Sequence, residues 1–447
     1  MLTIYGDRQR FCDGVSRRQF LRIGGMALGG LTLADFLAAE ACAAAKIPAQ
    51  KAVIIVYLPG GPPHQDTFDL KMEAPSDIRG EFKPMATSVA GIQITEHLPK
   101  IAAMMDRFAI IRSLVGARDE HANPLCLSGY TQAETNLKQP SLGACVAKIA
   151  GGGSGAIPPF VDMIQKTQHT PYSIPAAYGV LGRRHSAARL DEEGADDMKL
   201  RGITLQRLSD RRRLLQAVDG FRREVDASEV EARSVAVQQA FTILTSSKFI
   251  EALDVSREPQ AVRDRYGKGQ DRPAGDGCSL RNEQFLAARR LVEAGVRCVT
   301  LGYGFWDFHG SNFSNCKKYL PMLDQAVTAL VGDLHDRGLD KDVSVVVWGD
   351  FGRTPKINKD AGRDHWPQVS CALLAGGGMH TGQVIGSTTA DGGYADERPV
   401  HYRDVMATLL HQMGFDVRED QVVDEVGRPF FLYPGHEPIR ELITHSA

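Results

Sequence analysis

The segment from Val345 to Pro367, VVVWGDFGRTPKINKDAGRDHWP, combines residue types that could bind a metal ion. Its apolar first part predicts a buried strand that ends just before Asp350, and Asp364 and His365 follow fourteen residues later. Side chains just past the carboxyl end of such a strand lie in the crevice where open α/β sheets bind ligands. A carboxylate with an imidazole is what a metal-assisted hydrolase needs there. The alternative is structural, with Asp350 as a helix cap and His365 packed beside Trp366.

Acidic residues and histidines follow three other predicted strands as well. In a parallel sheet the carboxyl ends of the strands meet at one edge, so these side chains are expected to come together. Carboxylates with imidazoles suit zinc, manganese or a similar divalent ion. Two such ions would clamp an oxyanion and supply a nucleophile near neutral pH. The residues are His64, Asp66 and Asp69 after residues 51–58, Asp119 and His121 after 108–114, Asp307 and His309 after 296–301, and Asp350, Asp364 and His365 after 343–348.

The order of elements predicts an α/β fold with a largely parallel sheet sandwiched between helices. Apolar runs predict strands at residues 51–58, 108–114, 157–163, 296–301, 343–348 and 369–374. Helical spacing predicts helices from 119 or 120 to 129, and at 285–294, 317–337 and 403–413. Residues from about 186 to 293 are rich in Leu, Ala, Arg and Glu and predict a helical insertion, broken near 268–277. The triple glycine at 376–378 lacks the Lys-Ser/Thr of a phosphate loop and predicts a tight turn.

Residues 1–45 show the order of regions found in a bacterial export signal. The sequence SRRQFL at residues 16–21 is followed by a weakly apolar run and then by small residues that provide cleavage sites. The paired arginines resemble a twin-arginine signal, which the export machinery reads and which is not an anchor. Two acidic residues interrupt the apolar run, so the alternative of a membrane span is disfavoured. The mature protein is expected in the periplasm or outside the cell, without a stable membrane anchor. Twin-arginine cargo is often folded around a cofactor before export, which favours a bound metal.

Composition excludes several classes of function. The chain has 447 residues, of which 43% are hydrophobic and 24% charged, as is ordinary for a globular protein. Its formal net charge of −2 provides no basic footprint, so no nucleic-acid partner is expected. Six cysteines follow residue 45 at irregular spacings without a CxxC pair, which argues against a zinc ribbon. An oxidising compartment would permit disulfides among them, and buried thiols are the alternative.

Several motifs resemble the alkaline phosphatase and sulfatase superfamily. Residues 323–353 resemble the segment in which a helix, a Gly turn and a strand deliver a metal-binding Asp, residues 403–414 resemble a late helix, and residues 121–129 resemble the nucleophile-bearing helix. A closer resemblance is to a secreted bacterial family catalogued as domain-of-unknown-function family 1501, through the motifs PSDIRGEFKP, RRLVEAGVR, GDFGRTPKIN and GRDHWP. This resemblance covers nearly the whole chain. It implies one alkaline phosphatase-like α/β domain over residues 46–447, with the helical insertion inside it.

The resemblance also implies metal-binding roles for five residues. Asp66 corresponds to an early ligand position and Asp350 to a late one. Asp307 and His309 match a ligand pair of Asp and His, and His365 matches a final His.

Three features depart from the superfamily pattern. Phe351 stands where the superfamily often has His or Asn, and the Asp-x-His spacing of the middle pair is shorter than usual. No Ser, Thr or Cys lies between Leu114 and Leu125, and the sulfatase signature Cys-x-Pro-x-Arg is absent from the chain. A hydroxyl or thiol that would form a covalent intermediate is therefore not visible.

Together these observations predict an exported hydrolase that uses one or two divalent ions, zinc or manganese, to cleave phosphate or sulfate esters of small molecules or glycans. His121 or Asp119 would act as a base or as an extra ligand, and water activated by the metal would attack directly. Arg353 or Arg112 would stabilise the oxyanion. The alternative is a catalytically inactive binding protein for an anionic glycan or a protein partner. A third alternative, a structural envelope protein, would have neither a metal nor a charged crevice.

Overall fold

The computed structural model describes residues 51–443 except 136–137, 151–156 and 191–246. The predicted export signal and the larger part of the predicted helical insertion therefore lie outside the described residues. Ile47–Ala447 form one compact unit.

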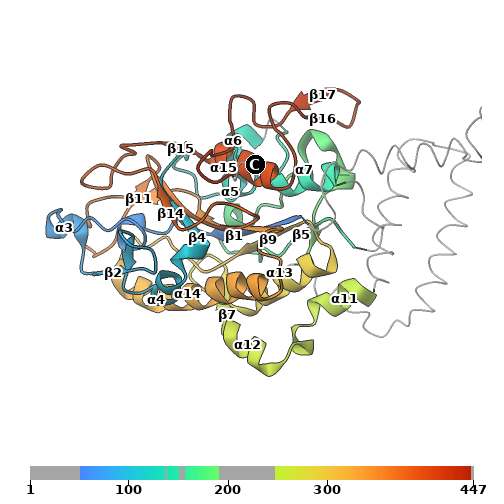
Figure 1. Ribbon diagram of the computed structural model, residues 1–447. Coiled ribbons are helices and arrows are strands. Elements are labelled where there is room, and N and C mark those ends of the chain that lie inside the picture. The colour runs from blue at the N-terminus through green and yellow to red at the C-terminus, as the bar shows by residue number, and fades with distance from the viewer. Residues whose placement is uncertain (1–50, 136–137, 151–156, 191–246, 444–447) are drawn as a thin grey trace, which may run out of the picture. The chain divides into compact units, whose positions relative to one another are not determined.

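A mixed sheet runs through the described part of the chain (Figure 1). Its strand order is β14-β4-β13-β10-β1-β9-β5-β6, and β15 also pairs with β4. The central strand β1, with the sequence AVIIVYL, is buried along its whole length, as expected for a parallel strand covered on both faces. The nine strands of this sheet are β1 Ala52–Leu58, β4 Phe108–Val115, β5 Phe160–Asp162, β6 Ala188–Arg189, β9 Cys298–Gly302, β10 Val343–Gly349, β13 Ser370–Gly376, β14 Gln383–Ile385 and β15 Val400–His401.

The strand directions bring the predicted ligand-bearing ends to one edge. Strand β1 runs parallel to both β10 and β9. Strand β13 is antiparallel to β10 and to β4, so β4 points the same way as β10. The carboxyl ends of β1, β4, β9 and β10 therefore share an edge of the sheet. The triple glycine at 376–378, which follows the reversed strand β13, lies at the opposite edge, and all three of its residues have positive φ, as a tight turn requires.

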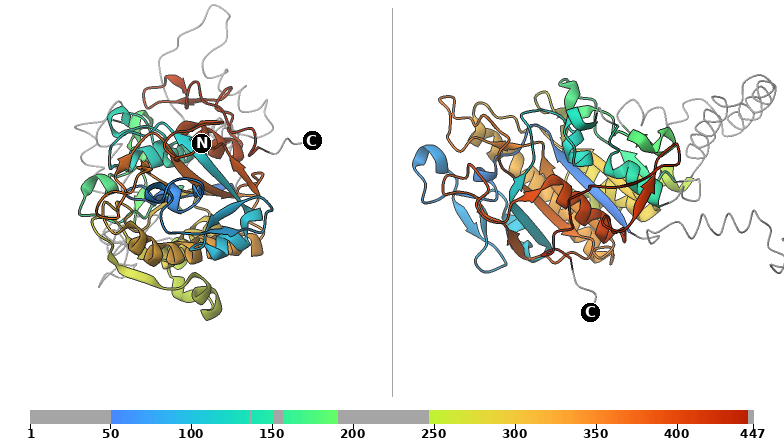
Figure 2. Two further views of the ribbon diagram at one scale, coloured as in Figure 1. Left: turned by 90° about the vertical axis from the view of Figure 1, so that its left-hand side faces the viewer. Right: turned by 90° about the horizontal axis from the view of Figure 1, so that it is seen from above.

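Helices cover the sheet on both sides, as Figures 1 and 2 show. Alternate residues of β1 enter two separate cores because successive side chains of a strand point to opposite faces. Ile54 and Val56 pack with α4 (Pro99–Ala103), α13 (Glu283–Ala294) and α14 (Asn312–Asp336). Val53 and Ile55 pack with α5 (Pro124–Ser128), α7 (Leu142–Ile149) and α15 (Tyr402–Gln412). The sandwich of helices around a largely parallel sheet matches the predicted fold class.

The helix predicted to begin at residue 119 or 120 is shorter than expected. Residues 116–122 form an irregular loop, and helix α5 begins only at Pro124. The reason is local, because proline has no N–H to donate within a helix and is favoured at the first helical position. His121 is consequently on a loop, where its ring is free to face the sheet edge.

The remaining described elements surround this framework. The described part of the predicted insertion contains short helices and a hairpin, whereas α13 belongs to the helical layer on the sheet. The short helices are α3 Ser76–Arg79, α6 Gln132–Thr135, α11 Ser247–Leu253, α12 Gln260–Tyr266, η1 His64–Asp66, η2 Met105–Arg107, η3 Thr170–Ser173, η4 Gly179–Leu181, η5 Arg183–His185 and η6 Val255–Arg257. The two-stranded pairs are β2 Pro84–Ala86 with β3 Gln93–Thr95, β7 Gly269–Pro273 with β8 Ser279–Arg281, β11 Gly352–Arg353 with β12 His365–Trp366, and β16 Gln421–Val423 with β17 Pro429–Phe431.

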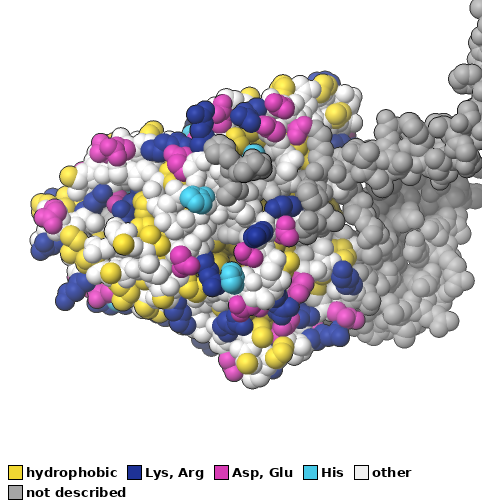
Figure 3. All heavy atoms as spheres, viewed as in Figure 1, with side chains coloured by type: hydrophobic (Ala, Val, Ile, Leu, Met, Phe, Trp, Pro, Cys, Tyr) yellow, Lys and Arg dark blue, Asp and Glu magenta, His cyan; other side chains and the backbone are white. Residues whose placement is uncertain are grey.

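The surface of the molecule carries charged side chains of both signs (Figure 3). On the face shown in Figure 3, Lys and Arg side chains are interspersed with Asp and Glu. Within the described part of the chain, no helix has both the length and the apolar character needed to cross a membrane.

The six cysteines that follow residue 45 are all buried and unpaired, and burial raises the pKa of each thiol.

Candidate metal centre

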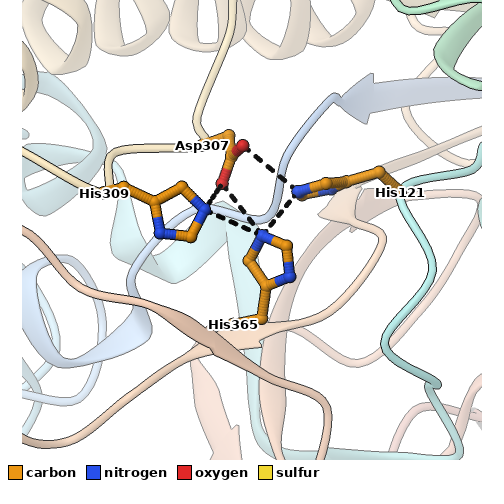
Figure 4. A group of neighbouring side chains, drawn as sticks. All are labelled: His121, Asp307, His309 and His365. Carbon is orange, nitrogen blue, oxygen red and sulfur yellow. Dashed lines mark hydrogen bonds and ion pairs between the residues drawn. The ribbon is translucent and has the colours of Figure 1, made fainter.

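Four side chains at the carboxyl edge of the sheet point toward one another (Figure 4). They are His121, Asp307, His309 and His365, whose candidate ligand atoms all lie within 4.8 Å of one another. The Nε2 atom of His365 is 2.8 Å from Nε2 of His121 and 2.9 Å from Nε2 of His309. Asp307 places Oδ2 at 3.2 Å from His121 Nε2 and Oδ1 at 3.0 Å from His309 Nε2. Three ring nitrogens and a carboxylate that converge in this way form a donor set for a divalent ion.

The four residues come from the ends of three parallel strands. His121 is on the loop after β4, and Asp307 and His309 are on the loop after β9. His365 reaches the same place through the small pair β11 and β12 that follows β10, in which it pairs with Arg353. The loop after β9 is attached to the loop after β1 by the hydrogen bond that Trp306 N donates to Pro59 O, at 2.7 Å. The topology of the sheet thus assembles the group from positions far apart in the sequence.

A carboxylate contacts the second ring nitrogen of each histidine. His121 Nδ1 lies 3.1 Å from Asp350 Oδ2, His309 Nδ1 lies 2.7 Å from Asp364 Oδ1, and His365 Nδ1 lies 2.7 Å from Asp119 Oδ1. An ionised carboxylate only accepts hydrogen bonds, so each pair selects the tautomer with the proton on Nδ1. In that neutral tautomer the lone pair of every Nε2 is directed at the centre of the group, where a metal ion would take the place of the Nε2 protons that Asp307 otherwise accepts. Carboxylate partners of this kind orient metal-binding histidines and raise their basicity.

Asp307 is held from behind by Arg353. The Arg353 Nη2 atom donates to Asp307 Oδ1 at 2.6 Å. The remaining donors of this buried guanidinium go to the carbonyl oxygens of Gly60, Gly61 and Arg363. Burial favours a raised pKa for the Asp307 carboxyl, but hydrogen bonds from His121 and His365 and the charge of Arg353 outweigh it and hold this pKa well below its usual range. Asp307 therefore presents a full negative charge.

The charges around His121 favour a cation. Burial by itself lowers the pKa of the His121 imidazole, but hydrogen bonds to Asp307 and Asp350 and their charges outweigh burial and raise it to about 9. The group of side chains therefore attracts positive charge, whether a proton or a metal ion.

Asp66 and Asp350 occupy different places from those that the resemblance implied. Both oxygens of the fully buried Asp66 accept hydrogen bonds from Arg363, at 2.7 and 2.8 Å, and Asn312 Nδ2 donates to Oδ2 at 2.8 Å. The guanidinium neutralises this carboxylate, so the structure does not bring Asp66 into the group. Asp350 contacts His121 and accepts from Gly60 N at 3.3 Å, so it lies one layer behind the donor atoms. The sequence did not indicate either arrangement.

The two arginines proposed for the oxyanion are also engaged elsewhere. Arg353 points its donors at Asp307 and at backbone oxygens, which makes it a positioning residue for that carboxylate. Arg112 donates to Phe68 O at 2.8 Å and to Gln93 O at 3.1 Å, away from the group. Asp119 and His121, proposed as base or extra ligand, take separate positions, with His121 inside the group and Asp119 behind His365.

The chain matches one protein-family model. The model described as "Protein of unknown function (DUF1501)" covers residues 50–443. The chain belongs to this family. No curated protein shows significant sequence similarity to this DUF1501 protein.

Solved structures with similar folds include hydrolases. A sulfatase from Pseudoalteromonas sp. is 12% identical, with 85% of this chain and 72% of that chain covered and a TM-score of 0.39. A phosphonate monoester hydrolase from Silicibacter pomeroyi is 12% identical, with 82% and 73% covered and a TM-score of 0.33. The lipoteichoic acid synthase LtaP from Listeria monocytogenes is 10% identical, with 85% and 78% covered and a TM-score of 0.33. These sequence identities and TM-scores are too low for the substrates of those proteins to be assigned to this chain.

Aromatic residues of this DUF1501 protein pack around His121, and two of them, Tyr172 and His169, were not among the residues predicted from the sequence. The ring of Tyr172 meets it edge-on at 5.2 Å between centroids, and that of Phe351 lies 4.8 Å away. His169 Nε2 is 3.2 Å from the His121 carbonyl oxygen. Tyr172 lies in η3 and His169 directly precedes it, in a segment without a motif, so the only signal that could have indicated them was their residue type. Phe351, noted as a departure from the superfamily pattern, serves here as packing for the histidine.

Proposed function

We propose that this protein binds one divalent ion through His121, Asp307, His309 and His365, and that it hydrolyses phosphate or sulfate esters after export. The observation that carries the proposal is the set of three histidines, each with a carboxylate at Nδ1 and with Nε2 facing Asp307. Surface clusters of acidic residues do not organise their neighbours in this way, whereas metal sites do. A divalent ion in such a site polarises an ester and lowers the pKa of water.

The number of ions is proposed as one. Among the described residues, the group around His365 is the single cluster of His, Cys, Asp and Glu side chains with converging ligand atoms. The carboxylate of Asp66, which would serve a second ion, is instead paired with Arg363. Asp350 uses one oxygen for His121. Of the one or two ions predicted from the sequence, one is therefore proposed, and zinc or manganese remains the candidate metal.

The charges around the centre favour substrates with a single negative charge. Four carboxylates, Asp119, Asp307, Asp350 and Asp364, contact the three histidines. Among the described residues, Arg353 is the one cation hydrogen-bonded to these carboxylates. A divalent ion leaves this group with an excess of one negative charge. Sulfate esters and phosphodiesters, which are monoanions, are therefore expected to bind better than dianionic phosphate monoesters.

Asp119 is the residue best placed to accept a proton from the attacking water. Both ring nitrogens of His121 are engaged, Nδ1 by Asp350 and Nε2 in the group, so His121 is not free to act as a base. Asp119 is exposed beside the centre and touches it through His365. An exposed carboxylate that reaches the reacting groups through one water molecule can take part in general base catalysis.

The test is metal content together with turnover of the full chain purified after export. We expect about one equivalent of metal per chain and multiple turnovers on an aryl sulfate or a diaryl phosphodiester. Replacement of His365 by Ala should abolish both, whereas replacement of the exposed His380, which is outside the group, should change neither. Less than half an equivalent of metal in the wild-type protein, or equal loss in both variants, would refute the proposal.

A second candidate function is that of a metal-stabilised binding protein for an anionic glycan or a protein partner. Four protein ligands complete a tetrahedral zinc shell, as in structural sites. Among the described residues, no Ser, Thr or Cys side chain hydrogen-bonds to the four. This candidate predicts stoichiometric metal and binding of a sulfated glycan without any turnover. Multiple turnovers on any ester that are lost in His365→Ala would exclude it.

A further inference from the structure

We propose that His309 is an exchangeable ligand: its imidazole completes the centre in the absence of substrate and swings out when an ester binds. This inference rests on the metal-dependent hydrolysis proposed above. It assigns different tasks to the two halves of the group, one that retains the metal and one that admits the substrate.

The number of protein ligands in the group makes such an exchange necessary. Catalytic zinc sites keep three protein ligands and leave a fourth position for water or substrate, whereas four protein ligands close the shell. This group supplies three imidazoles and a carboxylate. For a four-coordinate ion, turnover requires that one of the four side chains leave.

His121 and Asp307 form a half that has little freedom to move. The side chain of His121 is 13% exposed, and its partner Asp350 is 1% exposed. Its ring is enclosed by Tyr172 and Phe351. Asp307 accepts from Arg353, whose side chain is itself 1% exposed. Buried charged hydrogen bonds of this kind are costly to break.

His309 lies at the open side of the group. Its side chain is 48% exposed and its partner Asp364 is 52% exposed. Solvent screening makes a pair of this kind weak. Within the described part of the chain, the only ring in contact with the His309 ring is that of His365, at 4.7 Å between centroids.

The backbone at His309 allows its side chain to move alone. Asn358 Nδ2 donates to His309 O at 2.9 Å. The Cα of Gly362 packs so closely against this carbonyl that a Cβ there would come within 2.1 Å of it. The main chain is thus held while the ring faces solvent.

His365 is less suited to leave than His309. It is in strand β12, paired with Arg353. Its ring also contacts His121 at 4.3 Å and Phe351 at 4.9 Å. Its side chain is 25% exposed, about half the value for His309.

The first measurement uses the wild-type protein loaded with Co²⁺, whose visible absorption reports coordination number and ligand type. We expect a four-coordinate spectrum in the absence of ligand. Addition of an aryl sulfamate, a stable analogue of a sulfate ester, should give a spectrum that is still four-coordinate, with one nitrogen ligand fewer by electron–nuclear double resonance. Expansion to five or six coordination without loss of a nitrogen ligand would overturn the exchange.

The second measurement compares the metal affinity of His309→Gln with that of the matched variant His121→Gln, by competition with a chelator. We expect a loss of at most about 10-fold for His309→Gln and of more than about 100-fold for His121→Gln, with one equivalent of metal in His309→Gln at saturation. Equal losses would overturn the division of tasks while leaving the metal site intact. Absence of metal from the wild-type protein as well would instead refute the proposed function.

Discussion

Three aspartates stand behind the three histidines, and they differ in burial more than in geometry. Asp350 is enclosed by the protein, whereas Asp119 and Asp364 lie in solvent. A hydrogen bond between charged groups is worth more where water does not compete for it. The three similar contacts are therefore expected to contribute unequally to metal binding.

Replacement of Asp350 by Asn should weaken metal binding by about 10- to 100-fold, since the amide keeps the shape but not the charge behind His121. Competition with a chelator measures this loss. Asp364→Asn, which makes the same change behind His309, serves as the control and should lose no more than about threefold, because solvent already screens that pair. Equal losses in the two variants would contradict the role given to burial.

Removal of Arg363 should destabilise the fold without touching the metal. Arg363→Met leaves the buried carboxylate of Asp66 unpaired, which costs about 3–5 kcal/mol of unfolding free energy. Urea unfolding measures this cost, and the double variant with Asp66→Asn should regain much of it. Asp66→Asn alone should keep one equivalent of metal. If Asp66→Asn loses the metal, Asp66 is a ligand as the resemblance implied.

The residue types in the sequence predicted the members of the group better than they predicted the contacts between those members. His121, Asp307, His309 and His365 were all selected because they follow predicted strands. The sequence could not show that Asp350 would face a histidine. Nor could it show that Arg363 would pair with Asp66, 297 positions away, because such contacts depend on how loops from separate strands meet. Both Asp364 and His309 were named from the sequence, but the contact between them was not predicted.

At the scale of elements, long buried runs were predicted most closely. Strands β1 and β10 begin and end within about one residue of the predicted ranges, as expected for continuous apolar segments. The direction of β13 was not predictable from its apolar residues, since a strand buries the same side chains in either direction. The helix after residue 119 was predicted too long because the preference of Pro124 for the first helical position was not considered.

The cap of helix α15 should make stability depend on pH. His401 accepts from Arg403 N at 3.1 Å and begins the helix. Burial, and then the charges of His436 and Arg403, lower its pKa to about 4, against the opposing charges of Asp404 and Glu134. The folded state therefore takes up a proton later than the unfolded state does as pH falls. The stability from this site is complete above pH 6.5 and is lost as pH falls toward 4.

Comparison with His401→Asn isolates this effect, because asparagine can still cap the helix but does not titrate. Urea unfolding measures the free energy of unfolding of both proteins at pH 7 and at pH 4.5. Between these two pH values it should fall further in the wild-type protein than in the variant, by on the order of 1 kcal/mol after allowance for solvent screening. Other histidines with lowered pKa, such as His185, are present in both proteins and cancel in the comparison. Equal changes in the two proteins would exclude His401 as the source.

For the whole molecule, the metal should stabilise the fold, because its ligands come from loops after three strands of the sheet. A ligand that binds only the folded state adds about 2.7 kcal/mol at a concentration of 100 times its Kd. Calorimetry should therefore show a lower unfolding temperature after chelation, by several degrees. His365→Ala should melt at the same temperature with and without chelator. An unchanged wild-type melting temperature would mean that the ion is not bound.

Export should depend on the paired arginines. Replacement of Arg17 and Arg18 by Lys should leave the protein in the cytoplasm, since the export machinery reads this pair. Cell fractionation and amino-terminal sequencing measure the outcome, and Arg22→Lys, in the same basic segment, is the control. Delivery of the double variant to the periplasm at the wild-type level would contradict a twin-arginine route. The sequence carries this prediction alone, because residues 1–50 lie outside the described part.

The buried and unpaired cysteines make the described fold indifferent to redox conditions. The six thiols that follow residue 45 are enclosed in the two cores, where oxidants in solution do not reach them and their raised pKa values keep them protonated. Folding therefore needs no disulfide exchange. The same covalent structure can form in a reducing compartment and persist in an oxidising one, so a chain that folds before it is transported has no bond left to make on arrival.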